Sequence, residues 1–479
     1  MKFYVTTSIA YVNAEPHIGF GYELVLADTL ARHARQKGEK TIFGTGTDEH
    51  GGKVAEKAEE LGQLPKQYVD TIAKKFTDLK QLLNLSYDKF TRTTNIGHEK
   101  VAQKVWIDLS KDIYKNKYTG WYCQGDEAFF TDTVVKENEG ICPTHNRPYE
   151  RVSETNYFFK LSNYTKQIEH AIKSGKLRII PETRKHEILN VIKDGLDDIS
   201  ISRPKEKISW GLPIPGDDDQ VMYVWFEALL NYLTAVNYPN GEEFREFWPP
   251  DYQVIGKDII RFHAAIWPGI LLGLDLPLPK AIYAHGFINI DNQKISKSLG
   301  NSISVEELVD SFGTDAVRYY LLRHIPSYDD GNFSLKNLSD AYQNELGNEL
   351  GNALQRTAVM INTYQGGKFE KVSNPVDNKV TSRLIEECRF DRALDEIWLL
   401  VKQLNQYIDD NKPWTLHKAG DDQKLKTVLN TQVKKLVEIA YLLQPFLPET
   451  ADKINDTFKD GRVRLSQETL FPRKDLSTS

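Results

Sequence analysis

The sequence predicts an α/β fold, a doubly wound parallel sheet that is interrupted by an insertion and followed by a helical bundle. Residues 2 to 12 have the β-rich composition of a buried strand, and the apolar residues after them recur at helical spacing until Gly38. A second strand follows at 41 to 45. Strand, glycine-bearing turn, helix and strand open a doubly wound sheet, whose ligands bind beyond the carboxyl ends of the strands. A site is therefore expected at the edge that carries His17 and Asp48.

The middle of the chain predicts an insertion within this sheet. Between about 113 and 227 the pattern loosens into short strands and turns, and an aromatic-rich helix resumes over 221 to 235. Residues 281 to 290 are typical of a strand that leads into a lysine- and serine-containing loop. Helices are expected after that loop, at 305 to 312 and at 314 to 325.

The last third of the chain predicts a helical bundle. Long amphipathic segments lie near 336 to 364, 378 to 411 and 422 to 445, and no convincing strand accompanies them. The resulting domain boundaries are 1–112 and 228–290 for the two halves of the sheet domain, 113–227 for the insertion, 291–335 for the loop region and 336–479 for the bundle.

Composition limits the compartment and the partners. With 61 basic and 67 acidic residues the net charge is -6, so any RNA site must be local. The longest uncharged apolar stretch, 262 to 274, is too short to span a bilayer and contains Pro268. Only three cysteines are present, which favours a reducing compartment over a disulfide framework. We therefore expect a cytoplasmic protein with no membrane partner.

Two short segments have the chemistry of nucleotide binding. His17-Ile18-Gly19-Phe20 lies at the predicted strand-to-helix turn, where a glycine leaves room for a base or ribose and a helix N-terminus favours anions. Lys294-Ile295-Ser296-Lys297-Ser298 places two lysines on a loop, where they can act as point charges on a triphosphate. Alone, each segment is as consistent with an ordinary surface turn. Together, at the two ends of one α/β domain, they indicate an ATP site.

These two segments resemble the paired ATP signatures of class I aminoacyl-tRNA synthetases. The resemblance implies a Rossmann-type catalytic domain with an inserted connective-peptide domain, Mg²⁺ on the phosphates, and Arg203 near the active site. It implies that His17, Gly19, Lys257, Asp258, Lys294 and Lys297 surround ATP, with His17, Lys294 and Lys297 catalytic. The family's first signature usually ends in a second histidine, whereas this chain has Phe20. The departure predicts a reduced rate or a larger role for the two lysines.

Further segments resemble methionyl-tRNA synthetases, from Tyr4 to about Trp414. They are Tyr4 to Tyr11, Gly46 to Gly51, Asp126 to Phe130, Asn156 to Phe159, Tyr223 to Ala228 and Gly256 to Ile260. The resemblance implies a pocket for L-methionine in which Asp48 receives the α-ammonium group. Its lining would be Ser8, Ile9, Tyr11, Trp225, Ala228, Leu229, Tyr232, Ile259 and His263. Aromatic edges suit a thioether sulfur, although without the resemblance an aromatic helix is more consistent with core packing.

Two cysteine-containing turns have the spacing of a zinc knuckle. Cys123-x-x-Asp126 and Cys142-x-x-His145 are similar to the arrangement in zinc-binding relatives, except that Asp126 stands in place of a thiol. A carboxylate can ligate Zn²⁺, and a metal-free turn module is the alternative.

The bundle holds three candidate RNA contacts. Asn352 and Arg356 are four residues apart and so share one helix face, and Trp414 follows Pro413. The resemblance implies an α-helical anticodon-binding domain in which these three residues read the CAU anticodon of tRNA(Met). An indole can stack on an unpaired base, and the amide and guanidinium can hydrogen-bond to base edges. Without the resemblance, Trp414 is more consistent with a hydrophobic anchor.

The resemblance as a whole implies a methionine–tRNA ligase, with tRNA rather than DNA as the nucleic-acid partner. One alternative is a class I synthetase for another apolar amino acid. The insertion of about 115 residues is too short for the editing domain that such enzymes need. The other alternative is a non-catalytic tRNA-binding paralogue, which Phe20 keeps open. No dimerisation module follows the bundle, so a monomer is expected.

Overall fold

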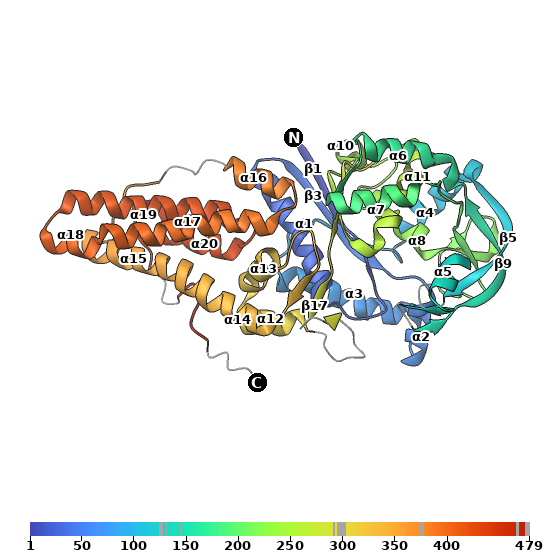
Figure 1. Cartoon of the computed structure of the whole chain (residues 1–479), viewed down its shortest axis with the longest axis horizontal. Coiled ribbons are helices and arrows are strands. Elements are labelled where there is room, and N and C mark those ends of the chain that lie inside the picture. Colours follow the sequence, from blue (N-terminus) through green and yellow to red (C-terminus); the bar gives the residue numbers. More distant parts are fainter. Residues whose placement is uncertain are drawn as a thin grey trace.

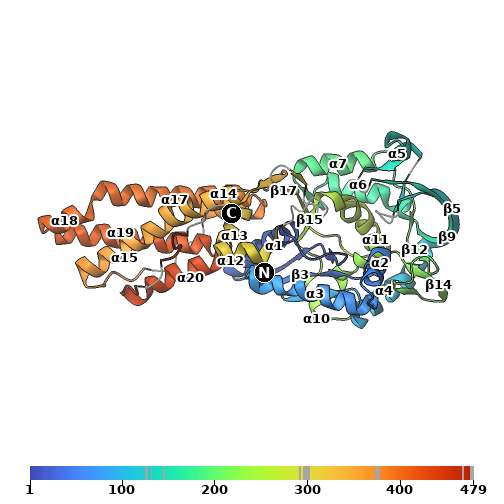
Figure 2. The ribbon, with the colours of Figure 1, turned by 90° about the horizontal axis from the view of Figure 1, so that it is seen from below.

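The computed structural model describes residues 1–123, 128–130, 132–143, 146–290, 293–294, 303–372, 378–465 and 469–474. The molecule is elongated, with a sheet and its covering helices at one end and a helical bundle at the other (Figure 1). A view turned by a right angle shows the same two parts in line (Figure 2).

A seven-stranded sheet forms the centre of the first part. Its strand order is β10-β16-β15-β1-β3-β2, with β4 beside β3, and all these pairs are parallel. The order reverses between β1 and β15, which is where doubly wound sheets bind their ligands. The strands are β1 (Lys2–Thr7), β2 (Ala10–Tyr11), β3 (Lys40–Asp48), β4 (Lys89–Arg92), β10 (Arg178–Ile180), β15 (Tyr252–Gly256) and β16 (Ala281–His285).

Two hydrophobic cores lie on the two faces of this sheet. In β15, Val254 belongs to one core and Ile255 to the other, because successive side chains of a strand point to opposite faces. Both faces are covered, so the central strands β1, β3 and β15 are buried along most of their length, including most of their threonines and Gln253. The first core includes α1 (Ile18–Gln36) and α3 (Pro65–Leu82), and the second includes α4 (Ile96–Asp108), α6 (Thr165–Lys173), α7 (Glu182–Ile192) and α11 (Trp267–Gly273).

The segment expected as one insertion, 113–227, leaves the main sheet twice. It first builds a four-stranded antiparallel sheet, then returns through α6, β10 and α7, and finally forms a three-stranded sheet. It returns because Ile179 of β10 and the apolar faces of α6 and α7 complete the second core. The strands outside the main sheet are β5 (Ile113–Cys123), β6 (Ala128–Phe130), β9 (Glu150–Phe159), β11 (Ile199–Ser200), β12 (Ser202–Pro204), β13 (Pro213–Ile214) and β14 (Asp217–Met222), with a hairpin of β7 (Ile141–Cys142) and β8 (Arg147–Pro148).

Three predicted elements of the sheet domain are divided in the structure. The strand expected at 2 to 12 is β1 followed by β2. The helix expected at 221 to 235 is replaced by the end of β14 and two short helices, α8 (Val224–Ala228) and α9 (Asn231–Thr234). The strand expected at 281 to 290 is β16 followed by β17 (Ile288–Ile290), which pairs with β18 (Gln293–Lys294) and β19 (Gly331–Phe333). The chain turns at Gly286, where an added Cβ would lie 2.2 Å from the carbonyl oxygen of Asp329.

The predicted bundle is confirmed, and it extends away from the sheet (Figures 1 and 2). None of the described helices is long and apolar enough to cross a membrane. The helices are α12 (Val305–Phe312), α13 (Thr314–Arg323), α14 (Leu335–Ala341), the π-helix Tyr342–Gly351, α15 (Asn352–Gln365), α16 (Lys379–Glu386), α17 (Phe390–Asn411), α18 (Pro413–Ala419), α19 (Asp422–Leu443) and α20 (Pro448–Thr457).

A buried ion pair joins the bundle to the sheet domain. Nη1 of Arg318 in α13 lies 2.9 Å from Oδ2 of Asp28 in α1, and both side chains are fully buried. The same guanidinium donates hydrogen bonds to the carbonyl oxygens of Leu83, Pro445 and Phe446. The helix that begins beside the expected ATP site is therefore fixed to the bundle along its length.

Candidate active site and bundle tip

The predicted pocket residues gather where the strand order reverses. Ser8 follows β1, and its backbone N–H donates to the carbonyl of Val254 in β15 at 3.0 Å. Tyr11 of β2 is in register with Asp48 at the end of β3, which places a buried carboxylate at the same edge. Ile259 follows β15 and is half-buried. Parallel strands bring their carboxyl ends to one edge, so residues far apart in sequence meet there.

His263 and Tyr232 form a buried hydrogen-bonded pair behind this edge. Nδ1 of His263 lies 3.0 Å from the carbonyl oxygen of Ile259 and must donate, so Nε2 accepts from the hydroxyl of Tyr232 at 2.7 Å. Burial lowers the pKa of His263 to about 4, which keeps the imidazole neutral. His263 lies in the π-helix Phe262–Ile266, a deviation from α-helix that is frequent at functional sites.

Two stacked aromatic rings lie in the segments that hold the predicted pocket residues. The rings of Trp225 in α8 and Phe262 are stacked, with centroids 3.9 Å apart and planes 13° from parallel. Trp225 is half-buried, whereas Ala228, Leu229 and Tyr232 are buried. The aromatic segment therefore contributes to the second core, while Trp225 stays partly accessible.

The first signature segment lies at the start of α1. His17 is the N-cap residue of that helix, and its Nδ1 accepts a hydrogen bond from the backbone N–H of Gly19 at 3.1 Å. A Cβ at residue 19 would lie 2.9 Å from Cε1 of His17, so the His17 ring can occupy this position only because residue 19 is glycine. Phe20 packs edge-on against Phe76 of α3, with centroids 5.1 Å apart. Position 20 thus contributes to packing with an apolar ring and offers no hydrogen-bond donor.

Lys257 and Asp258 begin the turn after β15. Nζ of Lys257 lies 2.7 Å from Oδ2 of Asp330 and 4.6 Å from the centre of the Phe287 ring. Burial raises the pKa of Asp330, but the hydrogen bonds from Lys257 and from the Phe287 backbone outweigh it and lower that pKa. Asp258 is exposed, and the absence of a Cβ at Gly256 leaves room for its carboxylate. Lys257 is therefore a cation held in place at the pocket edge.

A buried chain of hydrogen bonds at the same edge was not predicted from the sequence. The hydroxyl of Ser8 donates to Oε1 of Glu23 in α1 at 2.6 Å, and Nε2 of His285, the last residue of β16, lies 3.0 Å from Oε2. Burial lowers the pKa of His285, but the hydrogen bond and charge of Glu23 outweigh it and raise that pKa. A histidine that ends an apolar strand, next to Gly286, was the available sequence signal.

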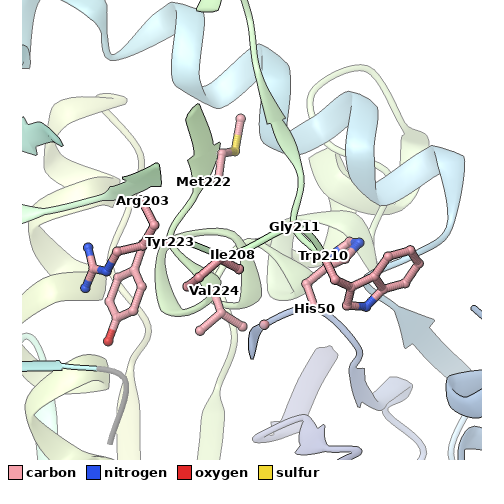
Figure 3. Close-up of a pocket in the computed structure, with 9 residues that line it drawn as sticks. His50, Arg203, Ile208, Trp210, Gly211, Met222, Tyr223 and Val224 are labelled. Atoms are coloured by element: carbon pink, nitrogen blue, oxygen red, sulfur yellow. The ribbon is translucent and has the colours of Figure 1, made fainter. Parts of the chain in front are cut away.

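Arg203 lines a small pocket between the insertion and the main sheet (Figure 3). Its guanidinium lies 4.2 Å from the centre of the Tyr223 ring and donates to the hydroxyl of Ser200 at 2.9 Å. His50 and Trp210 flank the other side, and Nδ1 of His50 is 2.6 Å from Oε1 of Glu227. Arg203 is thus held on β12 by contacts within the insertion.

Three predicted residues are not described, and a fourth is described only in part. Lys297, Asp126 and His145 lie outside the described residues, and for Lys294 the structure describes the backbone alone, paired with Asn289 in β18. Cys123 and Cys142 are buried in one small cluster with Val135 and Tyr149. Among the residues that the structure describes, no group of three candidate ligands for a metal is found.

The three predicted RNA contacts lie toward the far end of the bundle. Arg356 of α15 is 5.7 Å from the centre of the Trp414 ring in α18, and its Nη2 is 3.0 Å from Oδ1 of Asp409. Asn352 is exposed one turn away on α15. The structure therefore brings Arg356 and Trp414 into contact and leaves Asn352 on the adjoining surface.

Comparisons with known proteins agree with this geometry. The family described as "tRNA synthetases class I (M)" matches residues 3–151 and 145–358. The chain is 42% identical to the methionine–tRNA ligase of Clostridium acetobutylicum, over 99% of this chain and 78% of the relative. It is 40% identical to the same enzyme of Caldanaerobacter subterraneus, over 99% and 79%. It is similar to the structure of Mycobacterium tuberculosis methionyl-tRNA synthetase in complex with methionyl-adenylate, with a TM-score of 0.92 and 36% identity over 99% and 100%.

Proposed function

The chain belongs to the class I methionyl-tRNA synthetase family, and from that premise we propose that the site at the strand reversal converts L-methionine and ATP to methionyl-adenylate and pyrophosphate. As a methionine–tRNA ligase, it then transfers the methionyl group to the 3' end of tRNA(Met). One observation carries the proposal of the site. The buried pair of Tyr232 and His263 is tied to the turn after β15 through the carbonyl of Ile259, and the stacked rings of Trp225 and Phe262 belong to the same two segments.

We propose that the methionine side chain lies against Trp225, Ala228 and Tyr232. A polarisable thioether is favoured at aromatic edges, and the buried wall excludes water from it. Asp48 supplies a carboxylate at the pocket edge for the α-ammonium group, which gives a charge-assisted hydrogen bond. Ser8, Ile9, Tyr11, Leu229, Ile259 and His263 complete the lining. His263, neutral and held by two hydrogen bonds, orients the hydroxyl of Tyr232.

We propose that ATP binds along the start of α1 and the turn after β15. Its phosphates would meet His17 and the helix N-terminus, while Gly19 permits close approach and Lys257 adds a fixed cation. Lys294 and Lys297 follow β17 in the sequence and would bring two positive charges to the triphosphate, with Mg²⁺ bound to the phosphates. Asp258 and Arg203 border this site, from the turn and from the insertion.

The proposed reaction needs no covalent nucleophile from the protein. The methionine carboxylate attacks the α-phosphorus of ATP, the bond to the β,γ-phosphates breaks, and pyrophosphate leaves. A ribose hydroxyl at the tRNA 3' end then attacks the methionyl carbonyl, and AMP leaves with the electron pair of the mixed anhydride. The residues of the chain orient the two reactants and stabilise the charge that develops on the phosphate.

We propose that Asn352, Arg356 and Trp414 contact the anticodon of tRNA(Met). Their grouping at the bundle end, with an indole beside a guanidinium, suits stacking and base-edge hydrogen bonding of unpaired bases.

We further propose that the knuckle binds a structural Zn²⁺ ion. Its ligands would be Cys123, Asp126, Cys142 and His145. The two buried thiols in one cluster fit a soft metal ion, which would tie β5 to the hairpin of β7 and β8. Metal analysis of the purified protein tests this zinc site. If the protein contains no metal, the turns are held together only by the cluster of Cys123, Val135, Cys142 and Tyr149. The three free, buried cysteines support a reducing compartment, and we propose the cytoplasm.

Exchange of labelled pyrophosphate into ATP tests the proposed activation step. We expect exchange that requires methionine and is lost in Trp225→Ala, whereas exchange with isoleucine alone would overturn the methionine assignment. Phe20, which offers no donor, favours one rival function, a tRNA-binding paralogue. Absence of exchange with every amino acid, together with retained tRNA binding, would support that rival.

A further inference from the structure

A second aromatic pair bridges the same two helices as Arg356 and Trp414. Tyr364 of α15 and His417 of α18 are stacked, with ring centroids 4.2 Å apart and planes 20° from parallel. Tyr364 is half-buried and packs on the core, whereas His417 is exposed. One face of the imidazole therefore rests on a fixed ring, and the ring lies at the molecular surface.

The position of this pair is set by the short helix α18, at the end of the bundle farthest from the sheet (Figures 1 and 2). The helix lies between left-handed residues at Lys412 and Gly420, which orient it across the bundle end. By the helical rise of about 1.5 Å per residue, the second pair is roughly 5 Å from the first along α18 and roughly 12 Å along α15. A few nucleotides of single-stranded RNA span such a distance.

We propose that His417, supported by Tyr364, is a second stacking platform for tRNA, and that it takes a base of the anticodon loop that flanks the triplet. The inference rests on the proposed contact of Asn352, Arg356 and Trp414 with the triplet itself. Aromatic rings beside cationic side chains bind unpaired bases without reading their edges, and Lys412 and Lys418 are exposed on α18. The platform would contribute affinity and loop geometry, while the triplet contacts supply specificity.

The test uses an RNA hairpin with the anticodon loop of tRNA(Met) and the full-length protein. Loss of one stacked base weakens binding by about 5- to 100-fold, so we expect that loss of affinity in His417→Ala. His417→Phe retains a flat ring and should bind within about twofold of the parent. His186→Ala removes an exposed histidine from α7, far from the tip, and is the matched control that should leave binding unchanged.

Abasic nucleotides identify the base. In the parent protein, an abasic site next to the triplet should weaken binding, and in His417→Ala the same abasic site should add no further loss. Three outcomes would each overturn the proposal. They are unchanged RNA affinity in His417→Ala, a loss of affinity in His417→Phe, and an additive loss of affinity when His417→Ala is combined with each flanking abasic site.

Methionine-dependent pyrophosphate exchange separates this inference from the proposed function. Both His417 variants should retain exchange, because the tip is remote from the active site. His186→Ala should also retain it, because it removes only an exposed side chain of α7. If the parent shows no exchange, the proposed function fails at its own step. If exchange is intact and Trp414→Ala weakens hairpin binding while His417→Ala does not, the platform alone is wrong.

Discussion

The hydroxyl of Tyr232 donates to Nε2 of His263 across 2.7 Å, and the opposite nitrogen of the same ring donates to the carbonyl oxygen of Ile259. The imidazole is thereby fixed in one tautomer and in one orientation at the wall of the proposed methionine pocket. We predict that Tyr232→Phe raises the KM for methionine in pyrophosphate exchange more than it lowers kcat. The buried acceptor left on His263 should also cost about 1–3 kcal/mol of unfolding free energy. Equal KM values for the variant and the parent would contradict this role.

The low pKa of His263 predicts how stability depends on pH. The unfolded chain takes up a proton near the ordinary value of 6.5, whereas the folded chain does so only near 4. The contribution of His263 to stability is therefore complete above 6.5 and declines as the pH falls toward 4. NMR titration should show a neutral His263 throughout the neutral range, and in urea unfolding His263→Gln should lose less stability on acidification than the parent. A protonated His263 at neutral pH would exclude the assigned tautomer.

His285 predicts the opposite pH dependence. Glu23 raises the pKa of His285 despite burial. The ion pair therefore contributes its full stabilisation when the pH is below 6.5, the pKa of the histidine in the unfolded chain. It is lost as the pH rises through the folded pKa. We expect His285→Asn to cost about 3 kcal/mol near pH 6 and clearly less near pH 9, measured by urea unfolding. A pH-independent difference between the variant and the parent would mean that His285 is neutral in the folded protein.

Phe20→His should restore a hydrogen-bond donor to the first signature. If a missing donor limits activation, the rate of pyrophosphate exchange rises by about tenfold or more. The loss of the edge contact with Phe76 should lower the unfolding free energy by about 1 kcal/mol. Phe20→Leu is the control, since it loses the same contact and gains no donor. An unchanged or lower rate in Phe20→His would show that the other groups of the site supply enough charge stabilisation.

The pair of Asp28 and Arg318 should be strongly coupled. Arg318→Met leaves a buried carboxylate with fewer partners, and we expect a loss of about 3–5 kcal/mol in urea unfolding. The double variant Asp28→Asn, Arg318→Met should lose less than the sum of the two single variants, because the uncompensated charge is gone. Strict additivity would contradict a direct ion pair between α1 and α13.

Local patterns predicted the elements whose signals are long and periodic. The first strand, α1 and β3 were recognised because apolar spacing and Gly38 define them within about forty residues. β10 was not assigned to the main sheet because three residues, Arg178–Ile180, are too few to show a period, and its partner β16 begins only at Ala281. The helix expected at 221 to 235 is interrupted because Val221 and Met222 pair in β14, which only the fold reveals.

Some residues of the candidate site were likewise predicted from local patterns, and others could not be. The turn of His17 and Gly19 and the lysine loop at 294 to 298 are both local patterns, and together they predicted nucleotide chemistry from the sequence alone. The pocket residues were named through resemblance to a family, because an aromatic segment such as 225 to 232 is equally a core segment. The contact between Glu23 and His285 joins residues 262 positions apart, and no local pattern could indicate it.

The central position of β1 has a consequence for synthesis on the ribosome. One edge of β1 pairs with β3, but the other pairs with β15, which begins at Tyr252. At about 5–20 residues per second, the nascent chain spends roughly ten seconds or more with that apolar edge uncovered. An open strand edge is a template for pairing with another chain, so nascent chains are most prone to aggregate in this interval. Fragments that end within the insertion are therefore expected to remain insoluble, whereas synthesis past His285 closes the sheet.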